Sequence, residues 1–275
     1  MEPVRYRAIL AYDGTAYQGF QRLSDDQPSI QGAVEVALRQ ASGGQQVTIL
    51  GAGRTDAGVH ATGQVIAFDL DWKHDDDDLL RAVNALLPTE IALQRLERAR
   101  PAFHPRFDAV SRTYQYTVYE ANIRQPLLAK AAWWVRPPAK SQIDVDQMEK
   151  AATTLIGSHD FASFGNPTQG ERTQRDVYRS YWTVMDVHRS ALDARMLLYN
   201  IEASGFLYHM VRSIVGTLVD VGLGQMSIAA FIEAFQAADR ARIGKLAPAH
   251  GLTLIGVSYD QRGETPAREL GIVVR

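Results

Sequence analysis

Residues 49–61 read ILGAGRTDAGVHA, a glycine-rich stretch that decides between two fold classes. Glycines after a strand let the backbone approach a phosphate, as in the G-x-G-x-x-G fingerprint of a doubly wound dinucleotide-binding sheet. The third glycine of that pattern would fall on Asp56, whose carboxylate would repel a pyrophosphate. The next strand-like run begins at Gln64, which leaves too little chain for a crossover helix. A nucleotide-cofactor enzyme built on Gly51 and Gly53 is therefore the weaker hypothesis, and binding of NAD or ATP would reveal it.

The segments on either side of this stretch show two kinds of periodicity. β-branched and aromatic residues predict strands at residues 4–12, 46–50, 64–70, 113–119, 177–187, 194–203 and 252–259. Apolar stripes at helical spacing predict helices after Ser29, at 79–87, after Asp144, at 206–221 and after Ser227. Strand pairs flank helices more often than single strands alternate with them. An α+β fold with a mixed, mainly antiparallel sheet is therefore favoured.

A stretch with two prolines divides the chain into halves of modest size. Residues 95–112 contain Pro101 and Pro105 and predict a connector, so we place a boundary near residue 105. The expected domains are residues 1–105, which carry the glycine-rich loop, and residues 106–275. The acidic run at 75–78 is expected to be a solvated helix start whose charges complement the helix dipole.

The composition excludes several classes of protein. With 275 residues, 46% hydrophobic and 22% charged, the chain matches an ordinary globular protein, and the absence of cysteine excludes disulfides, thiolate nucleophiles and cysteine-ligated zinc. No apolar run approaches the ~20 residues of a spanning helix, and the first residues alternate charge with apolar side chains, unlike a signal peptide. We therefore expect a cytoplasmic protein with no membrane partner. A net charge of -2 argues against a uniformly basic coat for nucleic acid but leaves local basic patches open.

Three side chains of the glycine-rich loop have both a catalytic and a structural explanation. Asp56 is a carboxylate among small residues, which leave room for a bulky group to reach it. From composition alone, an Asx turn is the simpler explanation of this aspartate. Arg54 is either a surface charge or a cation beside the site, and His60 is either a second catalytic group or, more commonly for a loop histidine, a structural one.

Two residues of the second half add to this site. Arg212 lies in a helix with little polar face, and a buried guanidinium needs a carboxylate or a cleft. Asp56 is a candidate partner, and a structural ion pair with another acid is an equal alternative. Tyr114 lies on a strand that puts residues 114, 116 and 118 on one face. Its ring suits a nucleobase, whose stacking contributes roughly 1 to 3 kcal/mol, although core packing explains a strand tyrosine more often.

Taken together, these segments resemble the bacterial tRNA pseudouridine synthase A family. The resemblance rests, in order along the chain, on YDGTAYQGFQ at 12–21, GRTDAGVHA at 53–61, RTYQY at 112–116 and HMVRSIVG at 209–216. It implies the pseudouridine synthase fold, in which two α+β halves share a long sheet and the active-site cleft lies between them. It also implies a homodimer that binds tRNA and isomerises uridines 38, 39 and 40 of the anticodon stem-loop, with no cofactor and no metal.

The same resemblance assigns roles to four residues. Asp56 is the catalytic nucleophile, Tyr114 stacks on the target uracil, Arg212 is the ionic partner of Asp56, and Arg54 helps to hold the displaced nucleotide. Three routes stay open for Asp56: addition to C6 of the uracil, attack on C1′ of the ribose, or help with proton removal at C2′. Arg212 is expected to keep Asp56 ionised by opposing the burial that raises the pKa of a carboxyl group.

Phosphate contacts are expected to dominate the affinity for tRNA and to make it depend on salt. The candidates are Arg95, Arg98, Arg100, Arg106, Arg172, Arg175 and Arg179. A non-catalytic RNA-binding protein that uses the same cleft and tyrosine is the alternative from another class. That alternative predicts that Asp56→Asn leaves every activity of the protein unchanged.

Overall fold

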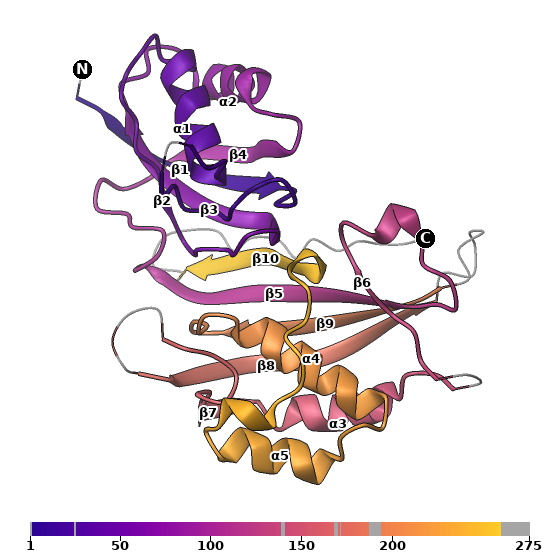
Figure 1. Cartoon of the computed structure of the whole chain (residues 1–275). Coiled ribbons are helices and arrows are strands. Elements are labelled where there is room, and N and C mark those ends of the chain that lie inside the picture. Colours follow the sequence, from indigo (N-terminus) through magenta and orange to yellow (C-terminus); the bar gives the residue numbers. More distant parts are fainter. Residues whose placement is uncertain are drawn as a thin grey trace.

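Both halves of the chain contribute strands to one large mixed sheet. Figure 1 shows this sheet from one edge strand to the other. The computed structural model describes residues 2–24, 26–138, 141–167, 170, 172–186 and 194–259. Within these ranges the sheet has ten strands in the order β4-β1-β3-β10-β5-β9-β8-β7, with β2 paired to β3 and β6 paired to β5. All pairs are antiparallel except β10 with β3 and β6 with β5. The prediction of a mixed, mainly antiparallel sheet is therefore confirmed.

The first half of the chain supplies one end of this sheet and two helices. Its elements are β1 (Val4–Tyr12), α1 (Ile30–Ala41), β2 (Leu50–Gly51), β3 (His60–Leu70), α2 (Asp76–Leu86) and β4 (Ile91–Arg98). Along β1 every second side chain is buried, as the two-residue period of a strand requires. Tyr6 and Leu10 of this strand share one core with Leu38 of α1 and Val83 of α2. Ser29 caps α1 by accepting from the backbone N–H of Gly32, at 3.2 Å.

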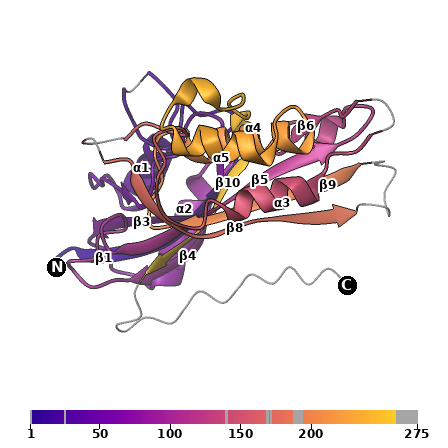
Figure 2. The same cartoon turned by 90° about the horizontal axis from the view of Figure 1, so that it is seen from below.

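The second half supplies the other end of the sheet and three helices. Its main elements are β5 (Ala109–Glu120), β6 (Trp133–Val135), α3 (Val145–Thr153), β7 (Gly157–Asp160), β8 (Gln174–Asp186), β9 (Arg195–Ala203), α4 (Met210–Gly222) and α5 (Ile228–Gln236). Short 3-10 helices are η1 (Pro126–Leu128), η2 (Arg240–Arg242) and η3 (Ala249–Gly251). Figure 2 shows α3, α4 and α5 together on one face of β5, β8 and β9.

Helix α4 is almost entirely buried, as its nearly continuous apolar sequence predicts. A segment that follows α5 crosses it so closely that a Cβ at Gly216 would lie 1.6 Å from the carbonyl oxygen of Lys245. Only glycine fits this crossing. The same segment also reaches the first turn of α4, where the backbone N–H of Ala247 donates to the carbonyl oxygen of Arg212 at 3.2 Å.

The last strand joins the two halves of the chain. β10 (Leu252–Tyr259) pairs with β5 along its length and with β3 at Thr253 and Leu254, opposite His60 and Ala61. The division into residues 1–105 and 106–275 stays a prediction, and residues 260–275 lie outside the described part of the chain.

Several predicted boundaries are wrong, each for a local reason. The pattern at 46–50 predicts a strand, but only Leu50–Gly51 pairs, while Val47 and Ile49 are buried without pairing. The predicted connector 95–112 shrinks to 99–108, because β4 reaches Arg98 and β5 starts at Ala109. The predicted helix 206–221 begins only at Met210, because His209 has left-handed backbone angles. The predicted strand end at residue 187 lies outside the described residues.

Three strands have no counterpart in the predictions. β4 is an edge strand that pairs only with β1, so its exposed face carries charges that hide the strand pattern. β6 and β7 span only three and four residues, too few for a period to show.

Among the described residues, none of the helices is long and apolar enough to cross a membrane.

Candidate active site

The loop that carries Asp56 is held in place by the segment between β1 and α1. The hydroxyl groups of Tyr12 and Thr55 lie 2.8 Å apart and are buried, and the backbone N–H of Phe20 donates to the carbonyl oxygen of Thr55 at 3.1 Å. The backbone N–H of Gly58 donates to the carbonyl oxygen of Tyr17 at 3.4 Å. These bonds fix the residues on both sides of Asp56, so its carboxylate occupies a defined position.

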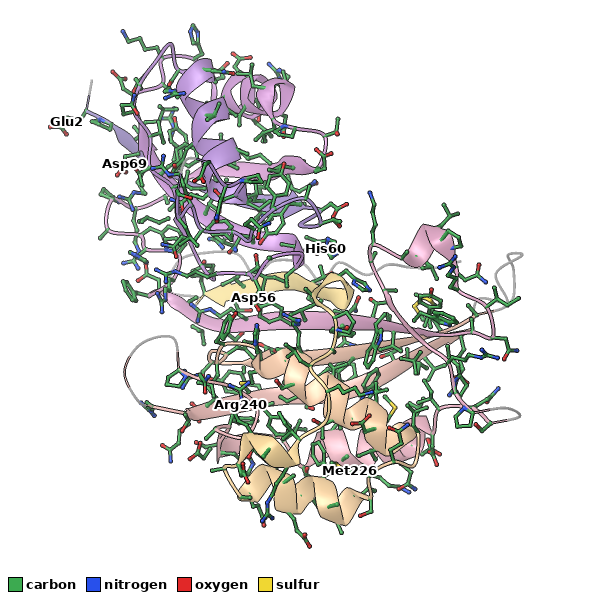
Figure 3. All side chains as sticks on the ribbon, in the orientation of Figure 1. Glu2, Asp56, His60, Asp69, Met226 and Arg240 are labelled. Atoms are coloured by element: carbon green, nitrogen blue, oxygen red, sulfur yellow. The ribbon has the colours of Figure 1, made fainter. Side chains whose placement is uncertain are left out.

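Asp56 lines a cavity of about 900 Å³ that both halves of the chain build. The cavity wall comes from loop residues 52–57, from β5 and from residues 204–212. The side chain of Asp56 is 26% exposed, and within the described ranges no backbone N–H bonds to its carboxylate. Figure 3 shows Asp56 beside β10, between the helices of the first half and α4. The carboxylate is thus open to a ligand and is not used up by an Asx turn.

Two basic side chains approach the same carboxylate oxygen. Arg212 Nη1 and His209 Nε2 each lie 3.6 Å from Asp56 Oδ2. Arg212 is 13% exposed and also donates from Nε to the carbonyl oxygen of Ala247, at 2.7 Å. Its position in the first turn of α4 explains how a guanidinium is tolerated in an apolar helix. Helix α4 opens onto the cavity at this end, and the charge has both a carboxylate and a carbonyl as partners.

His209 lies next to Asp56, although the sequence predicts no role for it within the segment 209–216. It precedes α4 with φ of 67°, a left-handed conformation that is uncommon for residues other than glycine. The ring of Tyr208 stacks on its imidazole, with centroids 3.7 Å apart and an interplanar angle of 26°. The backbone of Tyr208 is fixed in turn by a hydrogen bond to the carbonyl oxygen of Asn166, at 2.9 Å. The left-handed turn directs the imidazole at Asp56, and a pattern of apolar residues carries no signal of this turn.

Burial outweighs the two basic side chains in setting the pKa of Asp56. Desolvation raises the pKa of this carboxyl group above its ordinary value, and the nearby His209 and Arg212 offset the rise only in part. Arg212 thus acts against burial in the expected direction, although the pKa of Asp56 stays above its ordinary value. Burial also lowers the pKa of His209, against the attraction of Asp56. The site holds a carboxylate that is less acidic than a free aspartate, with a histidine that gives up its proton more easily.

Tyr114 lies in the cavity wall next to this group. Its ring is only 9% exposed and packs edge-on against Phe206, with centroids 5.0 Å apart and planes at 87°. Burial, with smaller effects of Tyr12 and Asp56, raises the pKa of its hydroxyl group. The ring is thus a fixed part of the wall, with a small exposed area toward the cavity.

The arginines around the cavity fall into two groups. Arg54 is exposed, lines the cavity, and has no hydrogen bond or ion pair with a described residue. Arg112, which the predictions did not single out, is partly buried and donates to the carbonyl oxygens of Ala52, Arg106, Ala109 and Ser204. Because Arg112 has no carboxylate among these partners, its charge adds to the positive potential of the cavity.

The predicted phosphate-binding arginines are also divided by the structure. Arg106 and Arg175 line the cavity. The others do not, and four of them form ion pairs: Arg95 with Glu97, Arg98 with Asp76, Arg100 with Asp108 and Arg179 with Glu202. Arg172 is exposed away from the cavity lining. The positive charge that faces the cavity therefore comes from fewer residues than the sequence suggests.

His60 has the structural role that is common for loop histidines. It is 8% exposed, its Nδ1 accepts from the backbone N–H of Gly14 at 3.1 Å, and its Nε2 lies 3.0 Å from the carbonyl oxygen of His250. It does not line the cavity and instead ties the loop to the segment before β10. In the described part of the chain, no group of three His, Asp or Glu side chains is placed to bind a metal ion.

Comparison with known proteins matches the chain to tRNA pseudouridine synthases in both a family model and individual relatives. A family model described as tRNA pseudouridine synthase matches residues 8–108 and 151–260. Proteins named tRNA pseudouridine synthase A are similar over most of their length. The one from Neisseria meningitidis serogroup B is 37% identical over 258 residues, covering 94% of this chain and 92% of the relative. Those from Brevibacillus brevis and Chloroflexus aurantiacus are each 40% identical, covering 93% and 91% of this chain and 99% and 87% of the relatives. From these matches and the cavity around Asp56, we conclude that the chain belongs to the tRNA pseudouridine synthase family.

Proposed function

We propose that this protein isomerises uridine to pseudouridine at positions 38, 39 and 40 in the anticodon stem-loop of tRNA, with Asp56 as the nucleophile. The observation that carries the proposal is the carboxylate of Asp56, 26% exposed in a cavity of about 900 Å³ and flanked by Arg212 and His209. Membership of the tRNA pseudouridine synthase family supports the choice of substrate.

The reaction makes few demands beyond such a carboxylate. Isomerisation breaks the bond from ribose C1′ to uracil N1 and forms the bond from C1′ to C5, and the proton on C5 moves to the released nitrogen. No atom is gained or lost and no electron is transferred. A positioned nucleophile that can form and release one covalent bond is sufficient. Asp56 meets this requirement, because its carboxylate is held by neighbours yet faces an open cavity.

The neighbours of Asp56 divide the remaining tasks. Arg212 and His209 favour the ionised form of the carboxylate against burial. Tyr114 supplies the ring against which the target uracil rests, and this contact offsets part of the few kcal/mol that it costs to take a base out of its stack. In our proposal Arg54, which is exposed and lines the cavity, contacts the phosphate of the displaced nucleotide.

The fold supports a shared cleft. In our proposal the two halves of the chain form the pseudouridine synthase fold, with Asp56 from the first half and Arg212 from the second facing each other across the cleft. We further propose a homodimer, because two copies would present two basic surfaces to one tRNA and reconcile an RNA substrate with a net charge of -2. Sedimentation equilibrium tests the dimer, and a monomer at micromolar concentration would contradict it.

Incubation with an unmodified tRNA transcript, followed by nucleoside analysis of the anticodon arm, tests the activity. We expect pseudouridine from the unaltered protein. Asp56→Asn should form none while keeping most of its affinity for tRNA. If Asp56→Asn is as active as the unaltered protein, the nucleophile is wrong. If neither forms pseudouridine but both bind tRNA, the protein is an RNA-binding module.

A further inference from the structure

An exposed phenylalanine stands at the rim of the cavity that contains Asp56. Phe107 is 76% exposed although it lines this cavity, and Leu23, also 76% exposed, lines it from the segment before α1. Single apolar side chains scattered on a surface need no explanation, but two exposed ones that line the same cavity indicate a binding surface. Neither side chain has a task in the proposed reaction at Asp56.

The turn that carries Phe107 is held by hydrogen bonds among its own residues. His104 Nδ1 accepts from the backbone N–H groups of Arg106 and Phe107, at 3.2 and 3.3 Å. The carboxylate of Asp108 accepts from the backbone N–H of His104 at 2.9 Å and from the guanidinium of Arg100 at 2.8 Å. A turn bonded in this way fixes the backbone from which the exposed ring projects.

Bonds to the sheet fix the same turn from below. Tyr259 at the end of β10 donates its hydroxyl group to the carbonyl oxygen of Pro105, at 2.8 Å. Arg112 on β5 donates to the carbonyl oxygen of Arg106, at 2.5 Å. The fold therefore holds an apolar ring in solvent, where burial gives it no stability. Such preorganisation lowers the entropic cost of binding a ligand to Phe107.

The surroundings of the ring indicate the kind of ligand. The imidazole of His104 lies 4.2 Å from the Phe107 ring, centroid to centroid, and Arg106 Cζ lies 5.9 Å from the Phe107 centroid. A largely exposed aromatic ring with a guanidinium over it matches a nucleotide, because the base stacks on the exposed part of the ring while the phosphate pairs with the cation. The cavity that Phe107 lines also contains Arg54, Arg112 and Arg175.

From this geometry we propose that Phe107 stacks on the base next to the target uridine, with Arg106 on the adjoining phosphate. The inference rests on the proposed function and extends it to a second nucleotide. To bring a uridine to Asp56, the RNA must open its stack, which exposes the face of a neighbouring base. An exposed ring on a fixed turn at the rim of the same cavity covers that face, whereas Tyr114 in the wall serves the target uracil itself.

Binding measurements on variants test the stacking contact. We expect Phe107→Ala to raise the dissociation constant for an unmodified tRNA transcript by about fivefold to a hundredfold, the loss typical of one base stacked on an aromatic ring. Phe107→Trp should stay near the unaltered protein, because it keeps an aromatic face. Leu127→Ala is the matched control, since Leu127 is 89% exposed in η1 and is not part of the cavity lining.

Photocrosslinking identifies the base. Anticodon stem-loops carrying 5-iodouridine at one position on either side of the target should crosslink to residue 107 in the unaltered protein, and mass spectrometry of the peptide locates the bond. In Phe107→Leu the crosslink should disappear although RNA still binds at higher protein concentration. The control Leu127→Ala should keep both the crosslink and the affinity.

The outcomes separate this inference from the proposed function. If the protein forms pseudouridine but Phe107→Ala binds tRNA normally and no crosslink forms, the stacking site is wrong and the activity stands. If no pseudouridine forms while Phe107→Ala weakens RNA binding, the activity is wrong and the stacking surface stands. If Phe107→Ala instead splits a dimer seen by sedimentation and leaves RNA affinity per chain unchanged, the ring contacts a second copy, and the proposal is overturned.

Discussion

Arg212 Nη1 lies 3.6 Å from Asp56 Oδ2, which joins the first turn of α4 to the loop before β3 across the cavity. The two residues come from opposite halves of the chain, so the ion pair exists only when the halves are assembled around β10. Despite this ion pair, burial raises the pKa of the Asp56 carboxyl group above its ordinary value. The molecule thus keeps a partly desolvated acid within reach of ligands, at a cost in free energy that the neighbouring Arg212 and His209 reduce without removing.

Replacing Arg212 should impair turnover more than folding. In Arg212→Met the pKa of Asp56 should rise further, because one of the two basic side chains that lower this pKa is lost. We expect kcat/KM at neutral pH to fall about a hundredfold, the usual cost of removing one group that stabilises charge in an active site. The low-pH limb of the rate profile should move to higher pH.

Arg212→Lys is the control for this variant, since it keeps the charge and should recover part of the activity. Loss of the hydrogen bond to Ala247 should lower the free energy of unfolding of Arg212→Met by only about 1 to 3 kcal/mol. A rate profile of Arg212→Met that coincides with that of the unaltered protein would remove the ion pair from the mechanism.

Neutralising Asp56 should stabilise the fold while it abolishes the reaction. The folded-state pKa of Asp56 lies above its unfolded value, so ionisation opposes folding. This penalty is fully present above the folded pKa and disappears as the pH falls below the unfolded value. Asp56→Asn should therefore resist urea better than the unaltered protein at pH 7, by about 1.4 kcal/mol for each unit of pKa shift. The difference should vanish toward pH 3, and a less stable Asp56→Asn at pH 7 would show that the pair with Arg212 outweighs burial.

The left-handed backbone of His209 separates its effect on stability from its effect on Asp56. Asparagine tolerates this conformation better than alanine, so His209→Asn should be more stable than His209→Ala by about 1 kcal/mol. Both variants lose the imidazole 3.6 Å from Asp56 and should show the same shift of the low-pH limb of kcat/KM to higher pH. Urea melts and pH profiles of the two variants check this together. Equal stability would mean that the turn at residue 209 stores no strain.

Two substitutions at Tyr114 distinguish its ring from its hydroxyl group. Tyr114→Phe keeps the edge-on contact with Phe206 and should bind tRNA nearly normally. Tyr114→Ala removes a ring that is 9% exposed, so tRNA binding should weaken by about 1 to 3 kcal/mol and unfolding should become easier by about 3 kcal/mol. Filter binding and thermal melts of both variants measure these effects. Unaltered turnover and affinity in both would exclude Tyr114 from the site.

How much the sequence predicts depends on the range of the interactions involved. The alternation in β1 and the Ser29 cap are local, and both appear in the structure at the predicted residues. The sequence also predicts that Arg212 needs a carboxylate partner, because a guanidinium in an apolar helix must be paired. The predicted strand at 46–50 fails because pairing depends on neighbours that the segment itself does not encode.

The parts of the site that no pattern indicates are those set by long-range contacts. His209 reaches Asp56 through a left-handed backbone conformation that is uncommon outside glycine. The spacing of residues in the sequence does not predict this conformation. The exposed position of Phe107 depends on Tyr259, from the far end of the described chain. Similarly, Arg112 serves the loop through carbonyl oxygens, partners that every residue offers and that no motif marks.

Gly14 should be essential for the position of Asp56 although it does not line the cavity. A Cβ at Gly14 would lie 2.0 Å from the carbonyl oxygen of Val59, which belongs to the backbone of the loop and cannot rotate away. Gly14→Ala must therefore push the loop at Val59 and stretch the bond from its own N–H to His60. We expect at least a tenfold loss of kcat, because small displacements of a reacting group are costly, together with a loss of stability.

Gly256→Ala is the matched control on β10, since its Cβ would meet nothing within 4 Å. That variant should keep full activity and gain about 0.4 to 1 kcal/mol from reduced entropy of the unfolded chain. If Gly14→Ala forms pseudouridine as fast as Gly256→Ala, the segment before α1 does not set the position of the carboxylate.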